Sequence, residues 1–191
     1  MSGLETLTPG HVGAVVTYLE MNERPPPRPI PESPLRLERW ASVDPERYRT
    51  LFRQVGGRWL WFSRLAMSDS ELLKKVGEVH EVRDETGRSA GMLELDFRAG
   101  KCMILFLGLV PEFAGRGHGR WLFAETLRLA WAPGVEQVQV HTCTLDHPAA
   151  LPAYLRAGFT AVGRAFESFP DPRLAGLLPR DAAPQLPLLE S

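Results

Sequence analysis

Three glycines alternate with basic residues in the stretch VPEFAGRGHGRW, which spans residues 110–121. Glycine lets the backbone approach a ligand closely and adopt positive φ angles. The free N–H groups and the positive dipole end of a helix then bind anions. The stretch follows an apolar run and opens an amphipathic one, so we predict a phosphate or pyrophosphate site where a buried strand meets a helix. The candidate binding residues are Gly115, Arg116, Gly117, His118, Gly119 and Arg120.

The glycine spacing narrows the choice of phosphate ligand. A Walker A loop requires Gly-Lys-Ser/Thr after its glycines, and that tripeptide does not follow here. A dinucleotide-binding turn requires G-x-G-x-x-G, whereas these glycines form G-x-G-x-G, although Glu136 follows at about the distance expected of a ribose-binding acid. A nucleotide-binding oxidoreductase therefore stays a less favoured alternative.

A second group of polar residues, His141, Cys143, Asp146 and His147, has the pattern H-x-C-x-x-D-H. Structural zinc sites usually combine two spaced ligand pairs, and the sequence has no second pair, so we predict no metal site. Instead, we expect His147 to cap a helix that starts at Pro148, and Cys143 to pack in the core or line a cleft.

The segments around these residues predict a mixed sheet. Polar turns at 84–87 and 98–101 separate β-prone segments at 79–83, 91–97 and 103–110, which indicates a three-stranded antiparallel meander. The last segment is apolar without alternation, so we expect it to be buried on both faces at the centre of the sheet. The other expected elements are strands at 12–19, 35–40, 135–142 and 159–167 and helices at 45–55, 68–76, 117–131 and 148–157. The strand-helix-strand order after the glycines is a crossover unit, so the predicted fold class is α/β with helices on both faces.

Composition limits the classes of function. The 191 residues are 44% hydrophobic and 24% charged, which is typical of one globular domain. The formal net charge of −1 argues against a nucleic-acid or membrane-surface partner. We see no signal peptide and no membrane-spanning run. The two cysteines, Cys102 and Cys143, do not suggest the disulfide scaffold of a secreted protein, so we expect a cytoplasmic location.

The prolines divide the chain. Twelve of the 17 lie in residues 1–34 or 170–191, which predicts extended arms around a compact centre. We therefore expect an N-terminal β-prone segment with a proline-rich arm (1–34), a domain (35–169) and a proline- and leucine-rich tail (170–191). The arms are candidates for contacts in a homodimer or for a cover over the cleft.

Two segments resemble the signatures of the GNAT superfamily of N-acetyltransferases. Residues 114–119, AGRGHG, resemble the acetyl-CoA signature [QR]-x-x-G-x-[GA] at a helix entrance, with Ala114 where Gln or Arg is usual. Residues 147–159, HPAALPAYLRAGF, resemble N-x-x-A-x-x-x-Y-x-x-x-G-F, with His147 where Asn is usual. The resemblance covers about residues 35–169 and implies a GNAT-like mixed central sheet, in which an antiparallel meander precedes a β-α-β crossover.

The resemblance implies an acetyl-CoA-dependent N-acetyltransferase. A neutral primary amine of a small molecule or peptide would attack the thioester directly, with acetyl-CoA as co-substrate and no metal. The pyrophosphate would bind at residues 115–120. Further cofactor contacts would be Leu109, Val110 and His147. Tyr154 would be the acid that protonates the leaving thiolate. Gly108 would mark a bulge in the buried strand at 103–110, because glycine inside such a strand otherwise costs stability.

For the general base, the resemblance favours Glu94, because family members often carry an acidic residue on this strand. The competing interpretation is that Glu94 and Asp96 lie on a plain solvent-exposed face. Together with Glu112, these carboxylates hint at a cationic acceptor. The alternative to an enzyme is a non-catalytic acyl-CoA-binding sensor or regulatory module, which the departures at Ala114 and His147 motivate.

Overall fold

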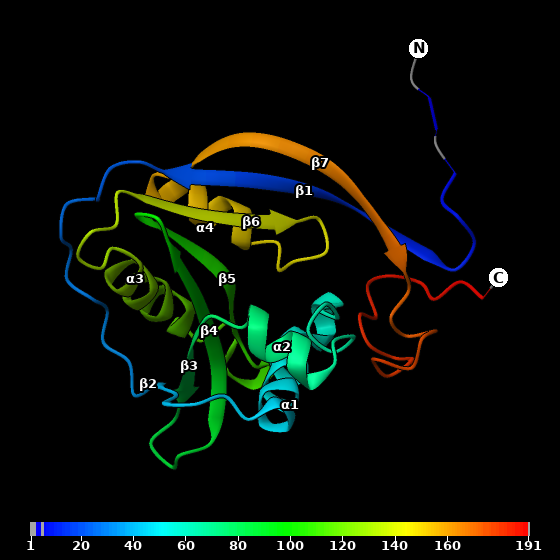
Figure 1. The fold of residues 1–191 in the computed structure, drawn as a ribbon, viewed down its shortest axis with the longest axis horizontal. Coiled ribbons are helices and arrows are strands. Elements are labelled where there is room, and N and C mark those ends of the chain that lie inside the picture. Colours follow the sequence, from blue (N-terminus) through cyan, green and yellow to red (C-terminus); the bar gives the residue numbers. More distant parts are fainter. Residues whose placement is uncertain (1–2, 5, 191) are drawn as a thin grey trace.

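One seven-stranded mixed sheet forms the centre of the computed structural model, which describes residues 3, 4 and 6–190 (Figure 1). The strands are β1 (His11–Met21), β2 (Arg36–Arg39), β3 (Glu78–Arg83), β4 (Ser89–Arg98), β5 (Lys101–Leu109), β6 (Gln137–Cys143) and β7 (Thr160–Pro170). Their order is β2-β3-β4-β5-β6-β1-β7. β5 pairs with β6 in parallel and the other pairings between the described strands are antiparallel, so the predicted meander and crossover are both confirmed.

Helices cover both faces of the sheet, as expected. The α-helices are α1 (Pro45–Gly56), α2 (Asp69–Lys75), α3 (His118–Ala130) and α4 (Ala150–Ala157), and the 3-10 helices are η1 (Gly57–Trp59) and η2 (Pro111–Phe113). Residues of α1 and α2 share one apolar core with the sheet, whereas residues of α3 and α4 share another. The α/β fold class is therefore confirmed.

Local hydrogen bonds explain where the first two helices begin. The carboxylate of Asp44 accepts a 2.8 Å hydrogen bond from the backbone N–H of Arg47, and Pro45 occupies the first helical position. At α2, Ser68 and Glu71 form a reciprocal capping box. Both starts agree with the sequence prediction.

The start of α4 was predicted two residues too early. The helix begins at Ala150 rather than Pro148, because residues 147–149 form a turn instead. In that turn Nδ1 of His147 accepts from the N–H of Ala149 at 3.0 Å, so the histidine does bond to the backbone just before the helix.

The first strand lies inside the sheet. β1 separates β6 from β7 and is antiparallel to both, and Tyr18 is opposite His141 on one side and Gly163 on the other (Figure 1). The N-terminal segment therefore supplies a strand to the sheet of residues 35–169. The proline-rich residues 22–34 then run to β2 without helix or strand, as expected.

The expectation of an extended C-terminal arm is wrong. Leu178 and Ala183 are buried in the core that α1 and α2 form with the sheet. Nη1 of Arg173 donates to the carbonyl oxygens of Ala182 and Leu186 at 3.1 and 2.8 Å. The number of prolines suggested an extended arm. The tail is folded instead, because burial of the apolar residues between the prolines stabilises it.

Candidate functional site

The central strands β5 and β6 separate from each other partway along their length. Their parallel pairing runs from Lys101 opposite Gln137 to Ile104 opposite Val140, while β5 continues to Leu109. Beyond Ile104, no strand of the described residues pairs with the side of β5 that faces β6. Its backbone polar groups are therefore available to a ligand that enters the opening.

This separation also corrects the expected burial of β5. Cys102 and Ile104 are buried, but residues 105–109, which lie beyond the end of the pairing with β6, are only half-buried. In the order of strands across the sheet, β5 is the fourth of seven, so its predicted central position is confirmed.

The bulge in β5 lies at Leu105 rather than Gly108. The pairing with β4 shifts between Glu94 opposite Phe106 and Leu95 opposite Ile104, which leaves Leu105 without a partner. Gly108 instead pairs regularly with Met92, and a Cβ there would lie 2.7 Å from Cγ1 of Val55 on α1. Close packing of α1 on β5 explains this glycine.

The predicted strand-end contacts have different surroundings. Leu109 is the last residue of β5 and is half-buried. The N–H of Val110 already donates to the carbonyl oxygen of Ala90 at 2.9 Å, so only its other groups could meet a ligand.

The glycine-rich stretch forms an open backbone turn at the start of α3. Gly115 and Gly117 have φ angles of 75° and 86°, which L-residues adopt only with strain. A Cβ placed at residue 115, 117 or 119 would meet no heavy atom within 4 Å, so the turn borders open space. Gly117 is the N-cap of α3 and supplies no side-chain cap, which leaves the first N–H groups of a 13-residue helix for an anion.

Two arginines lie in this turn and at the start of α3. Arg116 and Arg120 are exposed, and they stand next to the N-terminus of α3. His118 is half-buried, and its Nδ1 lies 3.2 Å from Oγ of Ser33 in the proline-rich segment. The chain between β1 and β2 therefore contacts the glycine-rich turn.

Tyr154 lies on α4 between two aromatic rings. Its ring centroid is 5.5 Å from that of Phe123 and 5.6 Å from that of Phe159, with both pairs edge-on. Burial raises the pKa of Tyr154 well above its usual value, and the charge of Asp146 raises it further. The phenol therefore stays protonated at neutral pH, which is the state a proton donor requires.

His147 is exposed and lies in the loop between β6 and α4. Its ring stands edge-on to the ring of Trp59, with centroids 5.2 Å apart. The structure thus brings His147 next to η1, on the side of the opening where α1 ends.

Glu94 does not lie on a solvent-exposed face. Its side chain is 0% exposed, and its Oε1 accepts from Nη2 of Arg64 at 2.9 Å and from the N–H of Gly77 at 3.0 Å. Oε2 accepts from the hydroxyl of Tyr48 on α1. Alternation of polar and apolar residues along a strand cannot distinguish a face exposed to solvent from a face covered by helices. Asp96, two residues further along β4, is partly exposed.

The sequence indicated Asp146 only as part of the H-x-C-x-x-D-H group, but the structure joins it to Trp61. Nε1 of Trp61 donates to Oδ1 of Asp146 at 3.2 Å, across a sequence separation of 85 residues. The indole packs against Phe52 and Phe106, with centroids 5.6 and 5.1 Å apart. No sequence pattern links two residues so far apart, so only the structure could identify the pair.

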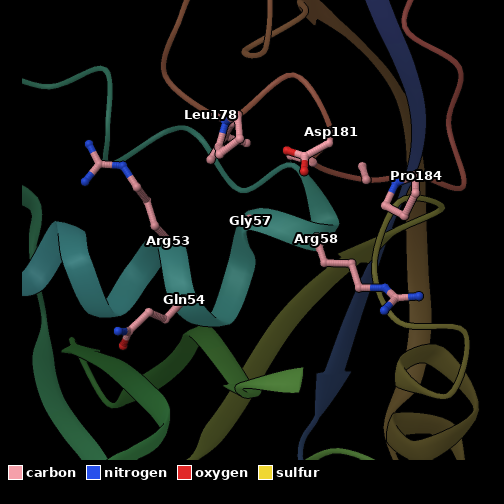
Figure 2. A pocket seen from close by; sticks show the side chains of 10 residues that line it. Arg53, Gln54, Gly57, Arg58, Leu178, Asp181 and Pro184 are labelled. Carbon is pink, nitrogen blue, oxygen red and sulfur yellow. The ribbon is translucent and has the colours of Figure 1, made fainter. Parts of the chain in front are cut away.

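A shallow groove lies between the end of α1 and the C-terminal tail (Figure 2). The end of α1 and the start of η1 form one wall, and the C-terminal tail from Leu178 to Pro184 forms the other. Arg53 and Arg58 point away from each other there. None of the predicted site residues lines this groove.

Two further features concern only the part of the chain that the structure describes. It holds no group of three or more His, Cys, Asp or Glu residues arranged for a metal ion. None of its helices combines the length and the hydrophobicity needed to cross a membrane.

Comparison with known proteins links these features to a family. The model of the acetyltransferase (GNAT) family matches residues 17–159. A mycothiol acetyltransferase from Clavibacter michiganensis subsp. michiganensis is 38% identical over 77 residues, which is 40% of this chain and 25% of that protein.

Solved structures show the same fold. A GCN5-related N-acetyltransferase from Sphaerobacter thermophilus has a TM-score of 0.58 at 21% identity, over 85% of this chain and 52% of that one. A structure assigned to the GNAT family from Novosphingobium aromaticivorans has a TM-score of 0.55 at 19% identity, over 87% and 69%. The chain thus spans about half the length of the first of these proteins.

Proposed function

Because the chain belongs to the acetyltransferase (GNAT) family, we propose that it transfers an acetyl group from acetyl-CoA to a primary amine of a small molecule or peptide. The amine attacks the thioester directly. The observation that carries this proposal is the opening between β5 and β6 beyond Ile104, which lies next to the glycine-rich N-terminus of α3. The match to a mycothiol acetyltransferase supports acetyl transfer but covers too little of that protein to indicate the acceptor.

The residues at the opening fit acetyl-CoA as co-substrate. The free N–H groups at Gly117 to Gly119 and the exposed Arg116 and Arg120 would hold the pyrophosphate, because the turn borders open space and carries positive charge. The free side of β5 up to Leu109 would bond to the pantetheine, much as a strand pairs with a sheet edge. Acetyl-CoA supplies an activated acetyl group and a thiolate leaving group. Val110 and His147 stay predicted contacts.

Tyr154 is the proposed proton donor to the leaving thiolate. Its phenol is buried on α4 and remains protonated, since burial raises its pKa. Glu94 stays the predicted general base. Its carboxylate already accepts from three donors, so direct contact with an acceptor would require the displacement of one of them.

Titration calorimetry tests the cofactor site. We expect micromolar binding of acetyl-CoA to the wild type and no binding of NAD. Gly117→Trp fills the open turn and should abolish binding. Gly87→Trp is the matched control, because Gly87 has nearly the same φ, 85° against 86°, and equally open surroundings in the turn between β3 and β4.

Turnover tests the enzyme itself. A panel of primary amines is incubated with acetyl-CoA, and thiol release is followed over many enzyme equivalents. Repeated turnover with any amine rules out the non-catalytic sensor, which is not favoured. NAD binding without acetyl-CoA binding would instead revive the oxidoreductase alternative and overturn the proposal.

We further infer a cytoplasmic location, without a nucleic-acid or membrane partner. Cys102 and Cys143 are free thiols, which suits a reducing compartment. A homodimer stays a prediction, and light scattering coupled to size-exclusion chromatography measures it directly.

A further inference from the structure

Trp61 connects the two sides of the opening. Its ring packs over the free part of β5, against Phe106 and close to Gly108, while its N–H reaches Asp146 in the loop after β6. Gly56 makes room for the indole, because a Cβ there would lie 2.3 Å from Cδ2 of Trp61. The position of the indole is therefore fixed by close packing on several sides.

The carboxylate of Asp146 is oriented by three donors. Oδ2 accepts from the hydroxyl of Thr142 at 2.7 Å and from the N–H of Cys143 at 2.8 Å. Oδ1 accepts from Trp61 at 3.2 Å. A carboxylate offers about four acceptor positions, so one position on Oδ1 stays available. Asp146 is half-buried, so part of the residue is accessible to solvent.

Asp146 also interacts electrostatically with the proposed proton donor. Its charge is one of the two causes that raise the pKa of Tyr154, so the two groups are electrostatically coupled. Asp146 lies in the loop that follows β6, whereas Phe106 lies on β5. Glu94, by contrast, is fully buried and balanced by Arg64. Asp146 is thus a partly exposed carboxylate that forms no ion pair with a cationic side chain among the described residues.

We propose that Asp146 binds the ammonium group of a cationic acceptor, and that Trp61 is the positioning residue that aims its free Oδ1 position into the opening. The inference rests on the proposed function and deepens it by naming the acceptor class. An ammonium donor suits this site, because charge-assisted hydrogen bonds to a pre-oriented carboxylate are stronger than neutral ones.

Two cofactor analogues test the site without knowledge of the natural acceptor. S-(2-aminoethyl)-CoA carries an ammonium group two carbons beyond the sulfur, and S-propyl-CoA carries a methyl group at the same place. Calorimetry at pH 7 gives the ratio of their dissociation constants. We expect the wild type to bind the aminoethyl analogue about 10- to 100-fold more tightly, as for one hydrogen bond to a charged group.

Three variants assign that preference. Asp146→Asn should reduce the ratio to about one while S-propyl-CoA still binds. Trp61→Phe keeps an aromatic ring but loses the N–H, and it should reduce the ratio several-fold. Glu136→Gln removes a carboxylate just before β6, at the other end of that strand, and should leave the ratio unchanged. If Asp146→Asn fails to fold, Trp61→Phe alone decides.

The outcomes separate the two proposals. If S-propyl-CoA binds the wild type and the aminoethyl analogue has no advantage, the acceptor inference is wrong and the cofactor site stands. An advantage that survives both Asp146→Asn and Trp61→Phe also overturns the inference. If neither analogue binds the wild type, the proposed function itself fails.

Discussion

Arg64 and Glu94 form an ion pair inside the protein, with Nη2 2.9 Å from Oε1 and the two side chains 8% and 0% exposed. The same guanidinium donates to the carbonyl oxygen of Lys75 at 3.2 Å, and the carboxylate also accepts from Tyr48. The pair therefore ties α1 and the chain around α2 to β4.

Removing one partner of this pair should be costly. Arg64→Met leaves the carboxylate of Glu94 buried without its cation, so we expect the free energy of unfolding in urea to fall by about 3–5 kcal/mol. Arg98→Met, in the exposed pair with Asp96, is the control and should cost less than about 1 kcal/mol. Equal losses in the two variants would contradict the buried position of Glu94.

Two adjacent glycines should respond oppositely to alanine. Gly56→Ala places a Cβ 2.3 Å from the ring of Trp61, so the indole must move and stability should fall by about 1–3 kcal/mol. Gly57 has a helical φ of −57°, and the nearest atom to its Cβ would be 3.9 Å away. Gly57→Ala should therefore stabilise the protein by about 0.4–1 kcal/mol in the same urea titration. A loss at residue 57 as large as at residue 56 would argue against this packing.

Tyr154→Phe should remove the proton donor. We expect kcat to fall about 100-fold with little change in acetyl-CoA affinity. Burial raises the pKa of Tyr154, and its protonated form therefore persists as the pH rises. The wild-type pH profile should accordingly show no loss from tyrosine ionisation below about pH 10. Tyr18→Phe, on an exposed ring of β1, is the control. Full activity of Tyr154→Phe at every pH would exclude the role.

Cys143 should be a poor nucleophile. Burial raises the pKa of its thiol to about 11, and the charge of Asp146 adds to the effect. Iodoacetamide should therefore label it at pH 8 roughly 100-fold or more slowly than a free thiol, as judged from ionisation alone. Asp146→Asn should speed the labelling. Intact-mass analysis after mixing with acetyl-CoA alone should show no acetyl adduct, and an adduct on Cys143 would contradict direct attack by the amine.

Arg173→Met should release the C-terminal tail. The ion pair with Asp171 is buried, with side chains 2% and 5% exposed, and the guanidinium also holds two tail carbonyls. We expect a loss of about 3–5 kcal/mol in stability and faster chymotrypsin cleavage after the leucines of the tail. Arg180→Met, at an exposed pair with Glu190, should leave both measurements close to wild type.

Local chemistry made much of this protein predictable from its sequence. The aspartate before Pro45 and the Ser68–Glu71 box start helices through hydrogen bonds that span three residues. Gly115 and Gly117 predicted a turn with positive φ angles at the start of a helix. Such features depend on the backbone geometry of a few consecutive residues, and the types of those residues determine that geometry.

The tertiary structure decided what lies next to what. Alternation along β4 indicated two faces but not that α1 and Arg64 would cover the one that holds Glu94. Nothing in the sequence placed β1 between β6 and β7, folded the tail onto α1, or brought Trp61 to Asp146. These outcomes depend on packing between segments far apart in the chain. The free energy that stabilises these arrangements comes from packing in the assembled core, which a local pattern of residues does not determine.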